Sequence, residues 1–300
     1  MPRRGRGRGF SSLRLKTRFI INPRSGASGP AVEPVRAFAA RQGAGVVFTE
    51  RPRHASELAA QALADGIELI VAVGGDGTMN EVAAVLRDTP AVFGLVPCGS
   101  GNGLGRQLGI HGSIGRALQI LHEGRTAVID SGTADGHPFF CASGLGFEAE
   151  LAARFNRLTK RGFLRYLSSG VALLREFEPI GCTITDRESR ETMQAFTVAV
   201  ANAAQYGNNA IIAPGARLDD GLINLTAVPP IGLISSLPLM YRLFAGTLNG
   251  HPRIKLHAGA SFLVERAKPG LIHTDGETHQ AGTRVEFAVR PASLRIRVPA

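Results

Sequence analysis

A short glycine-rich segment that follows an apolar run places the strongest constraint on how this chain folds. Residues 67–73 are apolar and partly β-branched without clean alternation, which predicts a strand buried on both faces of a parallel sheet. The chain continues with Gly74, Gly75, Asp76 and Gly77. Three glycines in four positions allow unusual backbone dihedral angles or the close approach of a phosphate. We therefore expect a sharp turn at the end of a strand.

A helix is predicted to begin at this turn. Thr78 and Glu81 have the spacing of a capping box, and the apolar residues that follow recur with a helical period. The free amides and the positive dipole end of a helix N-terminus suit an anion. Asp76 adds a carboxylate that could serve a phosphate-bound Mg²⁺. The segment therefore predicts a nucleotide site, with an ordinary strand-to-helix connection as the alternative.

Strands and helices alternate through the first part of the chain. Strands are expected at residues 18–22, 46–49, 67–73 and 91–96, with helices at 31–42, 54–64 and from 78 onward. This order predicts a doubly wound parallel sheet with helices on both faces, in which ligands bind beyond the carboxyl ends of the strands. The residues expected to hold the nucleotide at that edge are Asn22, Thr49, Gly74, Gly75, Asp76, Gly77, Thr78, Met79, Asn80 and Ser100.

The second part of the chain has a different pattern, so the predicted class is α/β plus all-β. After a helix at 113–122, short strands separated by turns are expected at 128–132, 138–143, 182–185, 195–201, 221–228 and 260–265. They predict an antiparallel β-sandwich. A helical insertion is expected at 149–177, and residues 231–248 are interpreted as a core or interfacial helix because Pro238 and Arg242 interrupt their apolar run. The predicted divisions are a basic flexible tail (1–17), a nucleotide-binding domain (18–127, completed by 285–300) and a lipid-binding sandwich (128–284).

Three motifs together resemble those of the diacylglycerol kinase and sphingosine kinase superfamily. They are Gly-Gly-Asp-Gly-Thr-x-Asn-Glu at 74–81, Asn-Pro-x-Ser-Gly at 22–26 and Asp-Gly-Glu at 275–277. The resemblance covers most of residues 18–300 and implies an ATP- and Mg²⁺-dependent kinase. Its acceptor would be a lipid hydroxyl of the diacylglycerol, sphingoid-base or phosphatidylglycerol class.

The resemblance also assigns roles in the second domain. Glu277 would be the general base that accepts the proton of the attacking alcohol, and Asp76 would address the catalytic Mg²⁺. Asp130 matches an acid near the lipid head group, with a strand-capping role as the equal alternative. The ligands implied for a second, structural Mg²⁺ are the Asp220 carboxylate and the carbonyls of Arg217 and Leu222.

The second glycine segment departs from the bacterial diacylglycerol kinase pattern. Gly103 stands where those relatives have an acid, and Gly-Ser-Gly-Asn at 99–102 looks more like sphingosine and ceramide kinases. NAD kinases share the Gly-Gly-Asp-Gly-Thr core and are the alternative, although their Asn-x-Glu motif is missing from the second half. A non-catalytic lipid- or RNA-binding protein with a kinase fold stays open.

Charge and cysteine content bear on location and partners. The net charge is +10, and the basic residues up to the start of the first strand, with no acid among them, are Arg3, Arg4, Arg6, Arg8, Arg14, Lys16 and Arg18. They predict attraction to an anionic membrane surface; since no aromatic stacking platform accompanies them, no nucleic acid partner is expected. Three isolated cysteines suggest no disulfide framework, and no signal-peptide-like run follows the tail. We expect a cytoplasmic, peripherally membrane-associated protein and leave a homodimer open.

Overall fold

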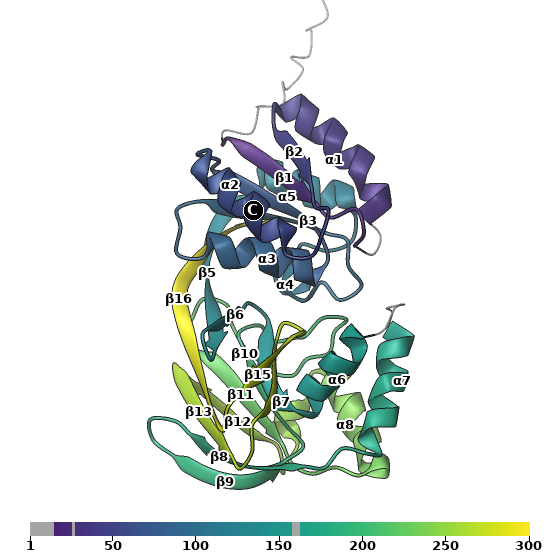
Figure 1. The fold of residues 1–300 in the computed structure, drawn as a ribbon, viewed down its shortest axis with the longest axis vertical. Coiled ribbons are helices and arrows are strands. Elements are labelled where there is room, and N and C mark those ends of the chain that lie inside the picture. Colours follow the sequence, from purple (N-terminus) through teal and green to yellow (C-terminus); the bar gives the residue numbers. More distant parts are fainter. Residues whose placement is uncertain (1–14, 26–27, 158–162) are drawn as a thin grey trace, which may run out of the picture.

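The computed structural model describes residues 15–25, 28–157 and 163–300, so most of the predicted basic tail lies outside the described residues. The elements of the first half are β1 (Thr17–Ile21), α1 (Ser28–Gln42), β2 (Gly45–Phe48), α2 (His54–Ala64), β3 (Leu69–Gly74), α3 (Asp76–Leu86), β4 (Val92–Pro97), α4 (Gly103–Gln107) and α5 (Ile114–Glu123). Strands β2, β1, β3 and β4 pair in that order, all parallel. Figure 1 shows this domain above the second one.

Helices cover both faces of the parallel sheet because each strand is apolar on both sides. Ile20 and Ile70 pack toward α2 and α3, whereas Phe19 and Val71 pack toward α1 and α5. All six residues of β3 are buried. The predicted doubly wound arrangement is therefore confirmed, and the carboxyl ends of its strands meet at one edge.

The second half contains most of the strands. Its elements are β5 (Arg125–Ala134), β6 (His137–Phe139), β7 (Ala142–Gly146), α6 (Phe147–Asn156), α7 (Phe163–Leu174), β8 (Ile180–Thr185), β9 (Arg190–Ala195), β10 (Thr197–Ala201), β11 (Ile223–Val228), α8 (Leu233–Ala245), the 3₁₀ turn η1 (Leu248–Gly250), β12 (Lys255–Gly259), β13 (Ser261–Arg266), β14 (Gly270–Thr274), β15 (Glu277–Ala281) and β16 (Arg284–Val298). A six-stranded antiparallel sheet has the order β12-β11-β10-β7-β14-β15. Its inner face, including Leu145 and Val200, packs against Val264 and Phe287 of the other sheet, as the predicted sandwich requires.

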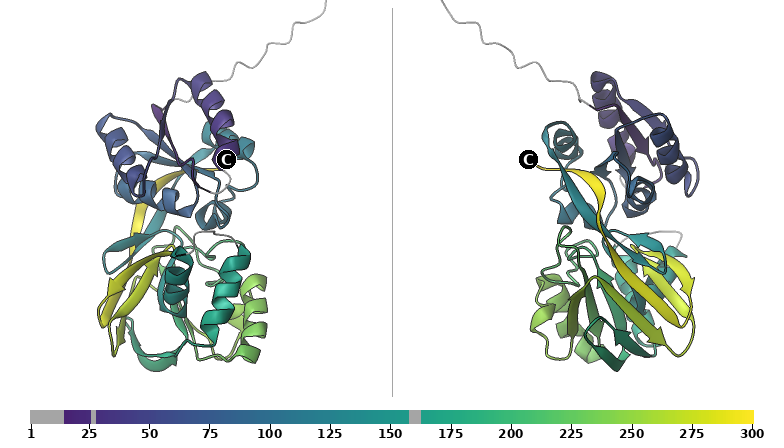
Figure 2. Two further views of the ribbon diagram at one scale, coloured as in Figure 1. Left: turned by 45° about the vertical axis from the view of Figure 1, so that its right-hand side comes forward. Right: turned by 90° about the vertical axis from the view of Figure 1, so that its left-hand side faces the viewer.

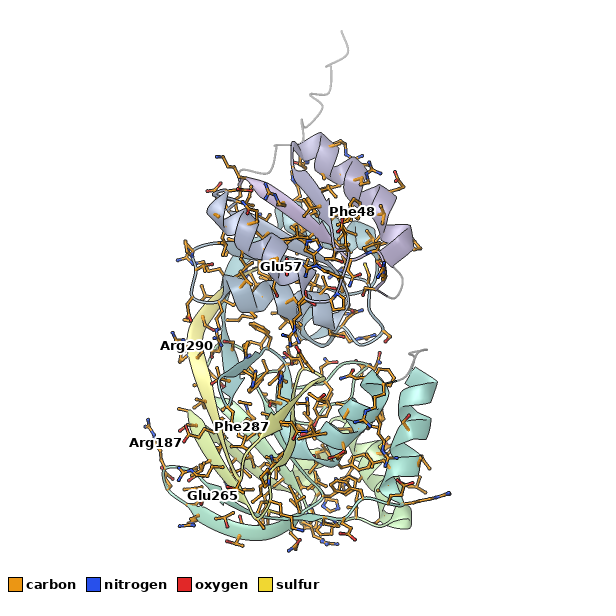
Figure 3. All side chains as sticks on the ribbon, viewed as in Figure 1. Phe48, Glu57, Arg187, Glu265, Phe287 and Arg290 are labelled. Carbon is orange, nitrogen blue, oxygen red and sulfur yellow. The ribbon has the colours of Figure 1, made fainter. Side chains whose placement is uncertain are left out.

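The long strands β5 and β16 join the two domains. They pair antiparallel along most of their length, with an irregularity between Arg290 and Leu294. Before it, β16 pairs with β13 of the sandwich; after it, Arg295 and Ile296 pair in parallel with β4. One ten-stranded sheet thus runs through both domains, as the yellow strand in Figure 2 shows. Near the junction Arg290, labelled in Figure 3, forms an ion pair of 3.1 Å with Asp88.

The predicted capping box is wrong. Helix α3 begins at Asp76 with Gly75 as its N-cap, so Thr78 already lies inside the first turn. The Glu81 carboxylate instead accepts hydrogen bonds from the amides of Arg53 and Ala55 at the start of α2. Tertiary contact between α2 and α3 overrides the local pattern, because the free amides of α2 need an acceptor.

The helices of the second half also differ from the prediction in detail. The predicted insertion at 149–177 forms two helices, α6 and α7, and the segment 231–248 forms α8 and η1. None of the helices in the described part of the chain has the length and apolar character to span a bilayer.

Candidate functional site

The first glycine turn connects β3 to α3 and needs its glycines for different reasons. A Cβ atom on Gly74 would lie 2.7 Å from the Thr78 hydroxyl oxygen, so a larger residue would displace that side chain. A Cβ on Gly77 would meet no atom within 4 Å, so the first turn of α3 has an open side there. Open backbone at a helix N-terminus is suited to an approaching phosphate.

Asp76 ties this turn to the second glycine loop, residues 99–103. Its Oδ2 accepts from the amide of Asn102 and its Oδ1 from the amide of Gly103, each at 3.0 Å. A Cβ on Gly99 would lie 2.8 Å from the Cα of Gly75, so the two loops touch through their glycines. Burial raises the pKa of Asp76 above its ordinary value, and these amides offset part of the rise.

Several residues predicted to hold a nucleotide support the turn from within. Thr78 is 4% exposed, and its hydroxyl accepts from the Asn22 side-chain amide at 3.0 Å. Met79 is 2% exposed in the core, and its own amide donates to the Gly75 carbonyl. Thr49 is buried at the end of β2. These side chains shape the edge of the sheet rather than face solvent.

The predicted residues Ser100 and Asn80 have different surroundings. Ser100 is exposed on the second glycine loop. Asn80, in α3, is half-buried, and its Oδ1 atom has no hydrogen-bond partner among the described residues. Ser25 was not predicted, although it belongs to the Asn-Pro-x-Ser-Gly motif; its Oγ accepts from the Gly75 amide at 2.7 Å.

The Asp-Gly-Glu motif forms the turn between β14 and β15, and Asp275 is its anchor. Asp275 Oδ2 accepts from the Phe140 amide at 2.7 Å, and Oδ1 accepts from the amides of Cys141 and Ala142 at 2.8 and 2.9 Å. Burial raises the pKa of Asp275 to about 6, although the three amides act in the opposite direction. The sequence motif contained this residue, but sequence reasoning singled out its glutamate.

Glu277 lies where the two domains meet. Its side chain is 58% exposed, and Oε1 is 3.3 Å from the Nη2 atom of Arg53, the N-cap residue of α2. Arg53 comes from the first domain and Glu277 from the second. The predicted general base therefore faces the nucleotide-binding half of the molecule.

The two carboxylate anchors meet around Cys141. A Cβ on Gly103 would lie 2.7 Å from the Tyr206 carbonyl oxygen and 3.1 Å from the Cys141 sulfur. Burial raises the pKa of the Cys141 thiol well above its ordinary value, and the charges of Asp275 and Asp76 add to that rise. The second glycine loop and the β14–β15 turn therefore converge, and the acid that the diacylglycerol kinase pattern would put at position 103 would have no room.

Three polar side chains, those of Tyr206, Glu148 and His273, contact one another beside the β14–β15 turn. The Tyr206 hydroxyl donates to Glu148 Oε2, and Glu148 Oε1 is 3.6 Å from His273 Nε2. His273 Nδ1 accepts from the Gly276 amide at 3.3 Å. Tyr206 carried no sequence signal; its role arises because the loop of residues 202–212 is folded between the domains.

The residues predicted for lipid and structural metal lie farther along the junction. Asp130 lies inside β5 and is 4% exposed, with Oδ2 accepting from the Gly221 amide and Oδ1 from the Ala292 amide. Its proposed place near the lipid head group stays a prediction. Asp220 Oδ1 accepts from the Leu222 amide at 3.1 Å, and Arg217 is paired with Asp219.

Metal binding by side chains alone has no support among the residues described. No three His, Cys, Asp or Glu side chains gather in a way that could hold an ion. Asp76 offers one carboxylate beside the open turn of α3, and Mg²⁺ in such sites takes most of its ligands from water and nucleotide phosphates. The residues present thus fit Mg²⁺ that arrives with a nucleotide. The structural Mg²⁺ at Asp220 stays a prediction.

Two family descriptions match the chain in succession. The diacylglycerol kinase catalytic domain matches residues 16–134, and the YegS C-terminal NAD kinase beta sandwich-like domain matches residues 142–298. A Pseudomonas fluorescens protein named "Probable lipid kinase YegS-like" is 31% identical over 278 residues, covering 89% of this chain and 91% of the relative. An uncharacterized Synechocystis protein is 32% identical over 261 residues, which are 84% of this chain and 59% of that relative.

Solved structures share the fold at low sequence identity. A diacylglycerol kinase from Bacillus anthracis superposes with a TM-score of 0.73 at 18% identity, covering 95% of this chain and 97% of the other. An NAD kinase from Archaeoglobus fulgidus in complex with ATP gives a TM-score of 0.57 at 12% identity, covering 94% and 93%. At these identities the likeness concerns the fold, which both enzymes share with this chain.

Proposed function

We propose a reaction for this chain, which belongs to the YegS-like family and has a diacylglycerol kinase catalytic domain. The chain would transfer the γ-phosphate of ATP, with Mg²⁺, to a lipid hydroxyl. The observation that carries the proposal is the convergence of two glycine loops from the first domain with the β14–β15 turn of the second. Phosphoryl transfer depends mainly on positioning and charge stabilisation, and convergent loops supply both.

The first domain supplies the donor side. The open first turn of α3 at Gly77, with Ser100 on the facing loop, offers hydrogen-bond donors to phosphate oxygens. Asp76 holds the facing loop at a fixed distance through two amides. Bound Mg²⁺ would neutralise phosphate charge beside this carboxylate. The chain's own contribution is to hold the donor in one geometry.

The second domain supplies the proton acceptor. Glu277 is exposed, so an alcohol can reach it, and it lies at the domain junction. Asp275 is the competitor because its pKa of about 6 suits a general base, but three amides already occupy its oxygens. We assign proton removal to Glu277 and the positioning of the turn to Asp275.

Labelled ATP tests the reaction. The purified chain is incubated with diacylglycerol, sphingosine, phosphatidylglycerol and NAD in separate tubes, with and without Mg²⁺. A labelled lipid formed only with Mg²⁺ supports the proposal and identifies the lipid class. Label in NAD alone would replace it with an NAD kinase, and no product with any acceptor would favour a non-catalytic binding protein.

A pair of variants tests the division of roles within the turn. Glu277→Gln should lower kcat by about 100-fold or more, with KM values for both substrates kept within about twofold. Asp275→Asn should raise the KM for the lipid as the turn loses one of its amide bonds. A Glu277→Gln enzyme with wild-type kcat would move the general base away from this residue.

A further inference from the structure

Helix α8 exposes large apolar side chains on one face. Leu237 is 71% exposed and Tyr241 is 75% exposed, and the two are four residues apart, so they lie one above the other on the helix. Phe244, one turn further, is 38% exposed, and Val171 on α7 is 44% exposed. Figures 1 and 2 show α7 and α8 side by side, on the side of the second domain away from β13. Neighbouring apolar side chains exposed to this degree mark an interaction surface.

The opposite face of α8 is packed against the protein. Leu239 and Leu243 pack on a buried cluster that includes Ile212 and Ala213. The amide of Ile211 donates to the Leu243 carbonyl at 2.9 Å. The helix is thus fixed in place, and its exposed side is a defined surface rather than a frayed end.

The segments that carry α7 and α8 contain bases but no acids. Residues 221–264 include Arg242, Arg253 and Lys255 without a single Asp or Glu, although the chain has 24 of these acids. Residues 151–175 likewise contain no acid, and their basic residues are Arg154, Arg157, Lys160, Arg161, Arg165 and Arg175. Acids from outside these segments pair with two of the bases, Glu191 with Lys255 and Glu176 with Arg154. An apolar helix face within basic segments is complementary to a bilayer with anionic head groups. Two copies of this face would bring like charges together.

The same helix lies one layer from the candidate site. Tyr206 packs against the cluster that α8 covers, and its carbonyl oxygen abuts Gly103 of the second glycine loop. A lipid that reaches the outer face of α8 is therefore separated from that loop by the segment of residues 202–213.

From these observations we propose that the α8 face, defined by Leu237 and Tyr241, docks the protein on an anionic lipid bilayer. The docking would deliver a membrane-borne acceptor to the site, and to that extent it rests on the proposed function. It places the apolar contact on a folded helix of the second domain, in addition to the electrostatic attraction expected of the basic tail.

Sedimentation of the full chain with vesicles, without ATP, tests the docking. Vesicles of phosphatidylcholine with phosphatidylglycerol are compared with phosphatidylcholine alone. The double variant Leu237→Ser/Tyr241→Ser should bind the anionic vesicles about tenfold more weakly, because it removes the apolar area that enters the bilayer. The loss should persist at high salt, where the contribution of the tail is screened.

Matched controls come from the first domain and the junction. Phe48 is 38% exposed on β2 and Val128 is 46% exposed on β5, and Figure 3 shows Phe48 in the first domain, remote from α8 in Figure 1. Phe48→Ser and Val128→Ser should leave vesicle binding unchanged. Arg253→Gln should weaken binding by up to about fivefold at low salt and have little effect at high salt.

Three results would overturn the docking surface. They are wild-type vesicle binding by the double variant at an unchanged melting temperature, an equal loss in the two controls, or a loss of self-association with vesicle binding intact. The last result would assign the face to a second copy of the chain. Failure of the kinase proposal is seen separately: a chain that phosphorylates nothing, yet loses vesicle binding in the double variant, retains the docking surface without the reaction.

Discussion

Asp76 in the first domain and Asp275 in the second make the same kind of hydrogen bonds on opposite sides of the candidate site. Each is an acid followed by glycine, and each carboxylate accepts backbone amides from a distant loop. Burial raises the pKa of both. They differ in setting, because Asp76 begins a helix whereas Asp275 occupies a turn with a positive φ of 49°. Asp76 therefore belongs to a segment that offers helix amides to an anion, whereas Asp275 fixes the turn that carries Glu277.

The largest expected effect separates the two acids by substrate. Asp76→Asn should lower kcat/KM for ATP by about 100-fold or more, because the amide group cannot accept from both Asn102 and Gly103 and offers no charge to a metal. Asp275→Asn should leave the KM for ATP unchanged and raise that for the lipid. Steady-state kinetics with each substrate varied in turn measures both. If Asp275→Asn impaired ATP binding as strongly, the two sides would not be distinct.

A larger side chain at position 103 should disrupt the contact between the second glycine loop and the second domain. Gly103→Asp would introduce the acid of the diacylglycerol kinase pattern, but its Cβ would lie 2.7 Å from the Tyr206 carbonyl. We expect a loss of about 2 kcal/mol or more in the free energy of unfolding, from overpacking and from charge beside Asp76. Denaturant titration measures it, with Gly115→Asp on the exposed side of α5 as control. Unchanged stability would mean that the loops can separate freely.

The pH dependence of stability tests the burial of Asp275. The pKa of Asp275 is about 6 in the folded protein and 3.8 in the unfolded chain, so the protonated carboxyl favours folding. This contribution to the free energy of unfolding is complete below the unfolded pKa and is lost as pH rises through about 6. The wild-type free energy of unfolding should therefore decline by roughly 1–2 kcal/mol more than that of Asp275→Asn between about pH 4 and pH 7. If the free energy of unfolding changed with pH in the same way in both proteins, the pKa of Asp275 would not be raised in the folded state. Asp76 contributes with the same sign.

The smallest expected effect on stability comes from a variant at Gly77, where the fold can accept a methyl group but a bound phosphate should not. Gly77→Ala meets no atom within 4 Å and lies in a helix, so it should stabilise the fold by up to about 1 kcal/mol. The same methyl group stands at the open side where a phosphate is expected, so the KM for ATP should rise. Melting temperature and kinetics are read on one sample. A stabilised variant with unaltered ATP binding would remove Gly77 from the phosphate site.

Sequence patterns were enough to predict the parallel sheet, the turn at residues 74–77 and the antiparallel strands of the second domain. These depend on short-range signals, since buried strands are continuously apolar and glycine permits tight backbone contact. Weakly apolar strands were not predicted: β9 alternates exposed and half-buried residues, and β14 and β15 owe their place to pairing around the Asp275 turn.

The folded structure was needed to show which carboxylates are buried as anchors and which face solvent. Glu81 caps a neighbouring helix, and Asp275 rather than Glu277 is the buried member of its motif. The backbone carbonyl of Tyr206 lies beside Gly103. A sequence motif gives the residue types and their spacing, but it does not show what surrounds each side chain in the folded protein. Burial and amide donors come from segments far away in sequence, and these set the charge and orientation of each carboxylate.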